Sequence, residues 1–264
     1  MPHPFATRPR DALGYRAVIG VLAPFTNTIV QAEYDDFRPA GVTNHMGRIE
    51  QLAIKTITDD EAGYEFVRQR LARDTEHVKL GIDQVMPAEP HSIVIGHSID
   101  SFRGGVKGAD KMKKELSEYA KGVPVYLPAQ AFLDALKVLG IPPGKRLSAV
   151  TPYFPPGDEQ VAEFFKDAGY DLVRIIGMKR GRGVEIAATQ MPDVMAVLKQ
   201  LAVDKPDVIV QPGTNMATAR FSAEASAWLG IPVISCNTAT YWHTLRSMGI
   251  MDRMDGFGTL FSDH

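Results

Sequence analysis

The chain contains a single cysteine, Cys236, among its 264 residues. One thiol excludes an internal disulfide and any metal site built from a cluster of cysteines. Long apolar runs are also missing: no window approaches eighteen consecutive apolar residues, and the N-terminal segment has no basic stretch followed by a sustained apolar one. We therefore expect neither a signal peptide nor a membrane span, and a cytoplasmic location.

An excess of charge of either sign is absent as well. The sequence has 29 Lys and Arg against 31 Asp and Glu, a formal net charge of -2, and its basic residues form no long run. A protein that follows a phosphate backbone or an anionic bilayer needs such a run, so nucleic acid and membrane are not expected partners. A hydrophobic content of 45% is enough to bury a substantial core.

Short runs rich in Val and Ile alternate with longer segments of helical period, which is the pattern of βαβ units around parallel sheets. This pattern predicts strands over residues 17–23, 92–96, 123–126, 147–151, 171–177, 207–211 and 231–235. It predicts helices over residues 59–79, 106–120, 128–139, 158–168, 191–203, 216–228 and 240–248.

Three pairs of segments form an approximate internal repeat. Residues 122–141 resemble 230–250, residues 92–100 (SIVIGHSID) resemble 207–215 (DVIVQPGTN), and residues 17–27 resemble 148–157. The order is the same in both copies, so the chain is predicted to fold as two similar α/β halves. We expect residues 1–122 with 231–264 in the first half and residues 123–230 in the second.

Four small polar turns follow predicted strands, at residues 24–28, 96–100, 152–157 and 212–215. Ligands of open α/β sheets bind outside the carboxyl ends of the strands, so these turns are expected to converge on a cleft. Backbone N–H groups and the hydroxyls of Thr26, Ser98 and Thr214 favour a carboxylate or another oxyanion. The alternative is that these are ordinary βα loops, which have the same composition.

The motifs APFTNTIVQAEYDDFRPAGVTNHMGRI, GHSIDSFRGG, TPYFPPGDEQVAEFF and GIPVISCNTATYWHTLRSMGI, with a terminal GFGTLF, give the chain a family resemblance. It resembles the maleate cis-trans isomerase and arylmalonate decarboxylase branch of the aspartate/glutamate racemase superfamily. The resemblance implies two flavodoxin-like (Rossmann-like) halves with parallel sheets, related by a pseudo-twofold, and an active site between them. It also implies a small carboxylate substrate, no cofactor, no metal, and a homo-oligomer of two or more subunits.

The same resemblance assigns residues. Asn27 and Tyr153 match the positions that grip the substrate carboxylate, and the turn at Gly96, His97 and Ser98 matches a carboxylate pocket. The family's catalytic cysteines, however, fall here at Gly96 or His97 and at Gly213, so both thiols are absent. Thiol-based racemisation and thiolate addition to a double bond are therefore not expected, because glycine cannot act as base, acid or nucleophile.

His97 is the first candidate to replace the thiols, since an imidazole can accept or donate a proton near neutral pH. The alternative is a turn residue that only forms hydrogen bonds. Asp100 could orient His97 or act as a base, or could cap a helix. Cys236, in a CNTA motif like one in glutamate racemases, could do chemistry or be buried and inert. His243 is expected to be packed or exposed rather than catalytic.

The basic segment 179–183 allows two interpretations. Arg182 could contact a substrate carboxylate, or the segment could be a solvated loop, which we favour.

These assignments predict a cofactor-independent enzyme that acts on a small carboxylate or dicarboxylate by acid–base chemistry next to the carboxylate, of decarboxylase, lyase or isomerase type. The alternatives are a hydrolase or hydratase in which His97 activates water, and a carboxylate-binding protein without activity. The candidate catalytic residues are His97, Tyr153 and Cys236. The candidate substrate-binding residues are Thr26, Asn27, Gly96, Ser98, Gly213, Thr214 and Asn215.

Overall fold

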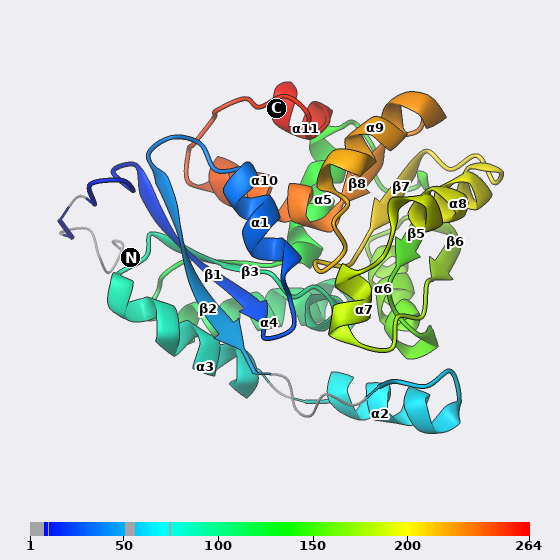
Figure 1. The fold of residues 1–264 in the computed structure, drawn as a ribbon, viewed down its shortest axis with the longest axis horizontal. Helices are drawn as coiled ribbons and strands as arrows, with labels where there is room; N and C mark the ends of the chain where they lie inside the picture. Colours follow the sequence, from blue (N-terminus) through cyan, green and yellow to red (C-terminus); the bar gives the residue numbers. More distant parts are fainter. Residues whose placement is uncertain (1–7, 10, 51–55, 74) are drawn as a thin grey trace.

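The computed structural model describes residues 8–9, 11–50, 56–73 and 75–264 (Figure 1). They form two four-stranded parallel sheets, of strand order β2-β1-β3-β4 and β6-β5-β7-β8. The α/β class and the two flavodoxin-like halves predicted from the sequence are confirmed. The first sheet contains β1 (Ala17–Pro24), β2 (Val42–Ile49), β3 (Ser92–Ile95) and β4 (Val125–Tyr126), and the second contains β5 (Arg146–Thr151), β6 (Asp171–Gly177), β7 (Val208–Gln211) and β8 (Val233–Ser235).

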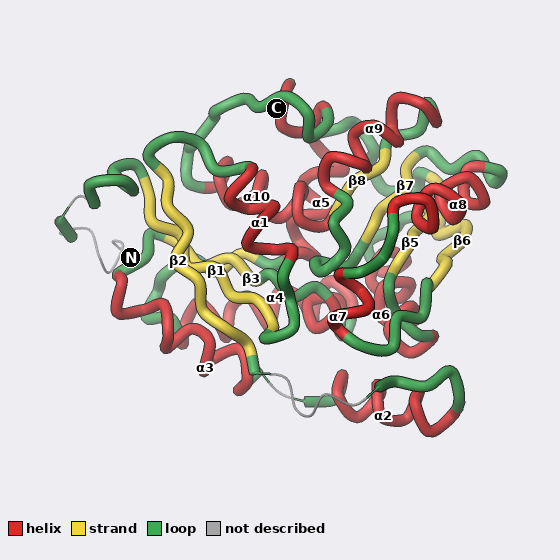
Figure 2. The backbone as a smooth tube through the Cα atoms, in the orientation of Figure 1, coloured by secondary structure: helices red, strands yellow, loops and turns green. Residues whose placement is uncertain are grey.

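Helices cover the sheets and join their strands (Figure 2). They are α1 (Ile29–Asp36), α2 (Glu61–Leu71), α3 (Glu76–Val85), η1 (Met86–Ala88), η2 (Ile99–Phe102), α4 (Gly105–Tyr119), α5 (Pro128–Val138), α6 (Pro155–Asp167), α7 (Gly183–Ala187), α8 (Met191–Ala202), α9 (Ala219–Leu229), α10 (Cys236–Ser247) and α11 (Thr259–Ser262). No helix in these described ranges has the length and apolar character needed to cross a bilayer.

The central strands explain why the Val- and Ile-rich runs were recognisable. All eight residues of β1 are buried, as are all four residues of β3 and of β7. A strand covered by helices on both faces needs apolar side chains at successive positions, and β-branched residues suit the pleated backbone. The repeated segments contain β1 and β5, β3 and β7, and β4 and β8, and each pair has the same place in its sheet.

Sheet pairing also bears on where the chain divides. β4 pairs with β3 in the first sheet, and β8 pairs with β7 in the second. The predicted division at residues 122 and 230 instead assigns β4 to the second half and β8 to the first, so each strand is separated from the sheet in which it pairs. Helix α10, which follows β8, packs mainly against α5 and also contacts β3 and β4. The division of the helices, and so of residues 1–122 with 231–264 against 123–230, stays a prediction.

Two elements near the N-terminus were not predicted, and two of the predicted helices differ from the observed ones by four residues or more. Strand β2 has the mixed sequence VTNHMGRI with only three buried residues, so it lacks the apolar run of a central strand. Helix α1 was also missed. A single helix over residues 59–79 is wrong, because the chain forms α2 and α3 with a break between them, and α10 begins four residues earlier than predicted.

Residues 56–73, which we call the arm, lie between β2 and α3 but pack against the second half. The N–H of Ile57 donates to the carbonyl of Gly181 at 2.9 Å, and Lys179 Nζ lies 2.8 Å from Asp59 Oδ2. Helix α2 of the arm contacts α6 and lies below it in Figure 1. The arm therefore joins the two halves on one side of the cleft.

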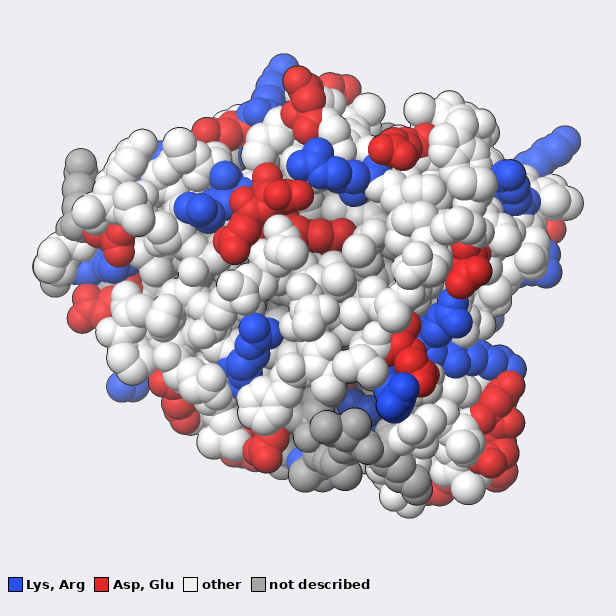
Figure 3. Space-filling model, in the orientation of Figure 1, with Lys and Arg blue, Asp and Glu red and all other residues white. Residues whose placement is uncertain are grey.

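On the side shown in Figure 3, Lys and Arg side chains are interspersed with Asp and Glu, and neither sign covers a large continuous area.

Candidate active site

A cavity of about 220 Å³ lies where the two halves and the arm meet. All four turns predicted to converge contribute to its lining. Of the predicted site residues, the lining includes Thr26, Asn27, His97, Ser98, Tyr153, Gly213, Thr214 and Asn215. Its volume is below the range usual for pockets that bind drug-sized molecules, so it suits a small ligand.

Asn27 connects the turn after β1 to the turn after β7. Its Oδ1 accepts hydrogen bonds from the N–H groups of Ile29 and Val30, at 3.0 and 2.9 Å, and so caps the start of α1. Its Nδ2 donates to Thr214 Oγ1 at 3.3 Å, and that hydroxyl donates to the carbonyl of Gly96 at 2.9 Å. One N–H of the Asn27 amide is left for a ligand.

Asn215 makes the second link across the cleft. Its Oδ1 accepts from the N–H of Thr28 at 3.1 Å, and its Nδ2 donates to the carbonyls of Gly183 at 2.6 Å and Thr26 at 3.3 Å. The side chain is buried and its hydrogen bonds are used within the protein. Asn215 therefore fixes the position of the two turns, and its proposed contact with substrate remains a prediction.

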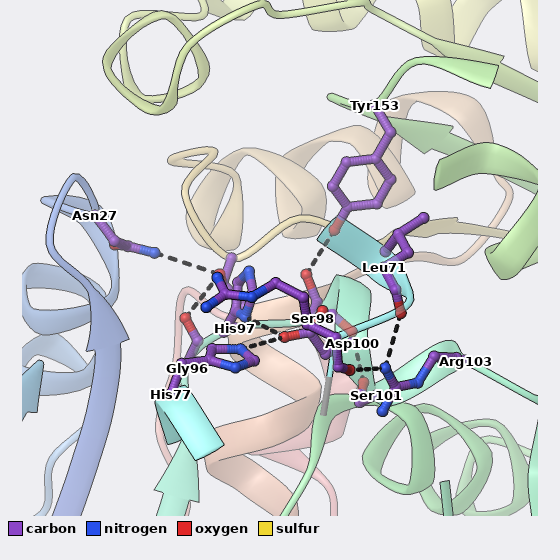
Figure 4. A network of polar contacts seen from close by, with 12 residues as sticks. Asn27, Leu71, His77, Gly96, His97, Ser98, Asp100, Ser101, Arg103 and Tyr153 are labelled. Atoms are coloured by element: carbon purple, nitrogen blue, oxygen red, sulfur yellow. Dashed lines mark hydrogen bonds and ion pairs between the residues drawn. The ribbon is translucent and has the colours of Figure 1, made fainter. Parts of the chain in front are cut away.

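Ser98 and Tyr153 meet across the cavity, one from each half. Ser98 Oγ lies 2.7 Å from the Tyr153 hydroxyl (Figure 4). Ser101 Oγ donates to the Ser98 carbonyl at 2.6 Å and holds the turn in place. Burial raises the pKa of Tyr153 well above its ordinary value, despite the hydrogen bond with Ser98. The phenol therefore keeps its proton and can donate to an oxyanion.

His97 lies beside a carboxylate that is shared with a second histidine. Asp100 Oδ2 is 3.1 Å from His97 Nδ1 and 3.0 Å from His77 Nε2 (Figure 4). The His77 contact is a hydrogen bond, whereas His97 Nδ1 makes an ion-pair contact outside hydrogen-bond alignment. Burial by itself raises the pKa of Asp100, but the two imidazoles outweigh it and hold that pKa below its usual value. Asp100 is therefore a fixed negative charge that orients imidazoles, not a helix cap.

Backbone donors are available on both sides of the cavity. Among described residues, the N–H groups of Ser98, Thr214 and Asn215 have no acceptor. Such groups at the ends of strands can stabilise an anion.

Gly96 does not have the role predicted for it. Its N–H donates to the carbonyl of Leu22 at 2.6 Å, and the residue is absent from the cavity lining. Only its carbonyl reaches the site, where it accepts from Thr214. The prediction that the Gly96 N–H donates to a ligand is therefore wrong, because that N–H already donates to the Leu22 carbonyl of the neighbouring strand.

Gly213 and Gly96, the glycines predicted at or next to the family's cysteine positions, have no room for a side chain. A Cβ on Gly213, whose φ is +155°, would lie 2.7 Å from Pro152 Cδ. A Cβ on Gly96 would lie 2.7 Å from Val30 Cγ1 and 3.0 Å from the carbonyl oxygen of Leu22. The neighbouring atoms thus leave space only for glycine at both positions, so a cysteine could not be introduced at either without moving them.

Cys236 lies at the start of α10, behind the cavity wall. Its side chain is fully buried and is not part of the lining. Burial raises the pKa of the Cys236 thiol to about 12, although the Gly213 N–H and the hydroxyls of Thr240 and Ser98 point toward it. A thiol with this pKa stays protonated near neutral pH, which disfavours a role as base or nucleophile.

One group of described residues has the donor atoms for a metal ion. The ligand atoms of His77, His97 and Asp100 all lie within 4.8 Å of one another. Two imidazoles and a carboxylate suit a divalent transition metal. The positive charge of Arg70 also acts on Asp100, however, and would oppose a cation there.

The structure adds residues that the sequence did not single out. His77, Arg70 and Arg73 line the cavity, although they belong to the arm and the start of α3. No motif marks them, because their place depends on how the arm crosses to the second half. Arg182 also lines the cavity, but its Nε lies 2.8 Å from Glu185 Oε1 and is already paired. His243, as expected, is packed, with Nδ1 3.0 Å from Asp134 Oδ2.

Comparison with known proteins identifies relatives of matching length. The model of the arylmalonate decarboxylase family matches residues 19–261. The maleate isomerase of Alcaligenes faecalis is 22% identical over 253 residues, covering 92% of this chain and 96% of its own. The arylmalonate decarboxylase of Bordetella bronchiseptica is 25% identical over 176 residues, covering 64% and 70%.

Solved structures show the same fold. The maleate isomerase of Pseudomonas putida S16, solved with maleate, superposes with a TM-score of 0.79 at 21% identity, covering 93% of this chain and 97% of its own. Because the family model matches nearly the whole chain, this protein belongs to the arylmalonate decarboxylase and maleate isomerase family of the aspartate/glutamate racemase superfamily.

Proposed function

We propose that the protein is a cofactor-independent enzyme that acts on a small carboxylate or dicarboxylate by acid–base chemistry at the carbon next to the carboxylate. The proposal rests mainly on one arrangement: His97 lies in the cavity next to Ser98, whose hydroxyl meets that of Tyr153 from the other half. This arrangement would put a proton-transfer group and oxyanion donors around one small space. Relatives named as maleate isomerases and an arylmalonate decarboxylase support a dicarboxylate.

The donors would act on charge that develops during the reaction. Hydroxyls of Ser98 and Tyr153 and the N–H of Thr214 would hold a carboxylate as it becomes an enediolate. Donors that are fixed before the reaction stabilise such charge without reorganisation, and losing one costs about 10²- to 10³-fold in rate. Asn27 would add one amide N–H from the first half.

His97 would handle the proton, with Asp100 and His77 holding its orientation. In a decarboxylation, the bond to the departing carboxylate breaks, carbon dioxide leaves, and the electron pair stays on the remaining carbon as the enediolate. The His97 imidazolium then donates its proton to that carbon and is reprotonated by water. One proton-handling group is sufficient for this sequence.

Racemisation is less well supported. It needs a proton acceptor on one face of the carbon and a donor on the other, and the family uses two thiols for this purpose. Gly213 occupies the second position here and has no space for a side chain. We therefore favour decarboxylase or lyase chemistry over racemisation, and isomerisation through a thiolate adduct is disfavoured for the same reason.

Product analysis in labelled water tests the proposal. The enzyme is incubated with substituted malonates, maleate and related acids in deuterated water, and in parallel in water labelled with oxygen-18. Deuterium fixed at the carbon next to the carboxylate, and lost in His97→Ala, supports the proposal. Oxygen-18 in the product without deuterium on that carbon would instead indicate a hydrolase. Stabilisation by an acid without any turnover would indicate a binding protein.

A further inference from the structure

Four arginines line the cavity, and they fall into two classes. Arg180 Nη2 lies 3.0 Å from Asp193 Oδ2, and Arg182 Nε lies 2.8 Å from Glu185 Oε1. By contrast, Arg70 and Arg73 line the same cavity, and no carboxylate of a described residue lies within ion-pair distance of either. The cavity therefore contains two positive charges that no ion pair within the described part of the chain neutralises.

The arm places these two charges together. Arg70 is in the last turn of α2, and Arg73 lies just beyond the C-cap Ala72, where its N–H donates to the Arg70 carbonyl at 3.2 Å and so keeps the two residues in one turn. Burial lowers the pKa of Arg70, the Asp100 carboxylate opposes this, and the positive charge of Arg73 lowers it further. Two like charges are thus held near each other in a partly buried place.

Asp100 does not resolve this repulsion. Its Oδ2 already faces both His77 Nε2 and His97 Nδ1. Removing a guanidinium from water beside a like charge is unfavourable unless an anion compensates. Guanidinium groups bind carboxylates and phosphates through two parallel hydrogen bonds, so an anionic ligand would satisfy both the charge and the donors.

We propose that Arg70 and Arg73 form an anion-binding subsite, here called the arm subsite, that holds the second acidic group of the substrate. This rests on the proposed function, in which Ser98 and Tyr153 hold the first carboxylate. The ligand class is a small aliphatic dianion whose second acidic group, a carboxylate or a phosphoryl group, stays on the molecule through the reaction, because guanidinium groups paired with a departing carboxylate would oppose its loss as carbon dioxide. The arm would then determine specificity, because it places the positive charges of Arg70 and Arg73 in a cavity that residues of the second half, such as Tyr153, also line.

The test measures binding and not turnover, using calorimetry with succinate and with butyrate, which has the same chain length but one carboxylate. Wild type is expected to bind succinate about 10- to 100-fold more tightly than butyrate. Arg70→Gln is expected to abolish that preference and Arg70→Lys to restore part of it. Arg180→Gln is the matched control, because Arg180 lines the same cavity but has its own carboxylate, and it keeps the preference.

Equal binding of succinate and butyrate by wild type would overturn the proposal, as would equal loss of preference in Arg70→Gln and Arg180→Gln. Arg73→Gln serves as a second variant if circular dichroism shows that Arg70→Gln does not fold, and is expected to lose the preference in the same way. A parallel titration with 3-phosphonopropionate shows which acidic group binds more tightly. Arg70-dependent binding with no turnover of any acid would support the arm subsite and contradict only the proposed function.

Discussion

Ser98 Oγ lies 2.7 Å from the Tyr153 hydroxyl, so a turn of the first half and a turn of the second half share a hydrogen bond at the cavity. Because burial keeps the phenol protonated, the pair offers donors to an oxyanion. The two hydroxyls do not come from corresponding positions of the two halves, because Ser98 follows β3 and Tyr153 follows β5. The site thus exists only when both halves are in register.

Replacing Tyr153 with Phe removes one of these donors without removing the ring. We expect kcat/KM to fall by about 10²-fold or more, because the lost hydrogen bond is strongest when charge develops on the substrate. Steady-state kinetics on the identified substrate measures this. The control is Tyr170→Phe, since the Tyr170 hydroxyl donates to the Ile141 carbonyl at 2.9 Å in the core and should affect stability alone. An unchanged kcat/KM in Tyr153→Phe would remove Tyr153 from the mechanism.

His97→Ala is expected to lower kcat by about 10²- to 10⁴-fold, the usual contribution of a positioned acid or base. His77→Gln should have a smaller effect and should shift the pH–rate profile, because His77 acts on His97 only through Asp100. The pH dependence of kcat/KM for wild type and both variants distinguishes these roles. His45→Gln, on an exposed position of β2, is the control and should match wild type. Activity that survives His97→Ala would show that another group transfers the proton.

Cys236→Ala should retain turnover within about threefold of wild type, since a buried thiol of raised pKa is not a proton carrier at neutral pH. It should cost roughly 1 kcal/mol of unfolding free energy through lost packing and hydrogen bonds. Kinetics and urea unfolding measure the two effects separately. If alkylation of native protein abolishes activity and substrate protects against it, the thiol has a direct role that this account denies.

Glu33 makes stability depend on pH. Burial raises the pKa of Glu33 to about 7, although hydrogen bonds from the Ala219 N–H and Asn237 Nδ2 lower that pKa in part. The unfolded chain loses this proton from about pH 4.5 upward while the folded chain keeps it, so the unfolding free energy should fall between about pH 4.5 and 7 and then level off. A decrease of roughly 1 to 3 kcal/mol over that range is expected.

Urea unfolding from pH 4.5 to 8 measures this slope in wild type and in Glu33→Gln, which cannot titrate. The slope should be reduced in the variant but not abolished, because burial also raises the pKa of Asp158 to about 7. A variant with the same slope as wild type would show that Glu33 is not the group responsible.

Much of the fold could be predicted because its central strands are buried on both faces and therefore have apolar runs. The internal repeat added that the chain has two similar halves, although the predicted division grouped β4 and β8 each with the half whose sheet it does not join. Strand β2 could not be found in this way, since an edge strand with only three buried residues has a mixed composition. The prediction of one helix over residues 59–79 was wrong because the apolar periodicity does not show that α2 ends at Leu71 and α3 begins at Glu76.

The sequence predicted the turns that contribute to the site, but not the lining residues that come from the arm and α3. Ser98, Tyr153 and Thr214 each lie within three residues of the end of a strand, so strand topology alone brings them to one cleft. His77 and Arg70 reach the cavity only through the path of the arm, which depends on contacts such as Ile57 with Gly181. Likewise, the sequence shows that cysteine is absent from Gly213, but only packing against Pro152 shows that no side chain fits.

The central claim is that one small cavity between the halves binds the substrate acid, and a crystal structure with bound succinate tests it most directly. We expect one carboxylate within about 3 Å of Ser98 Oγ and the Tyr153 hydroxyl, and the other within hydrogen-bond distance of Arg70. Succinate bound elsewhere on the protein, with this cavity lacking it at saturating concentration, would contradict substrate binding between the halves.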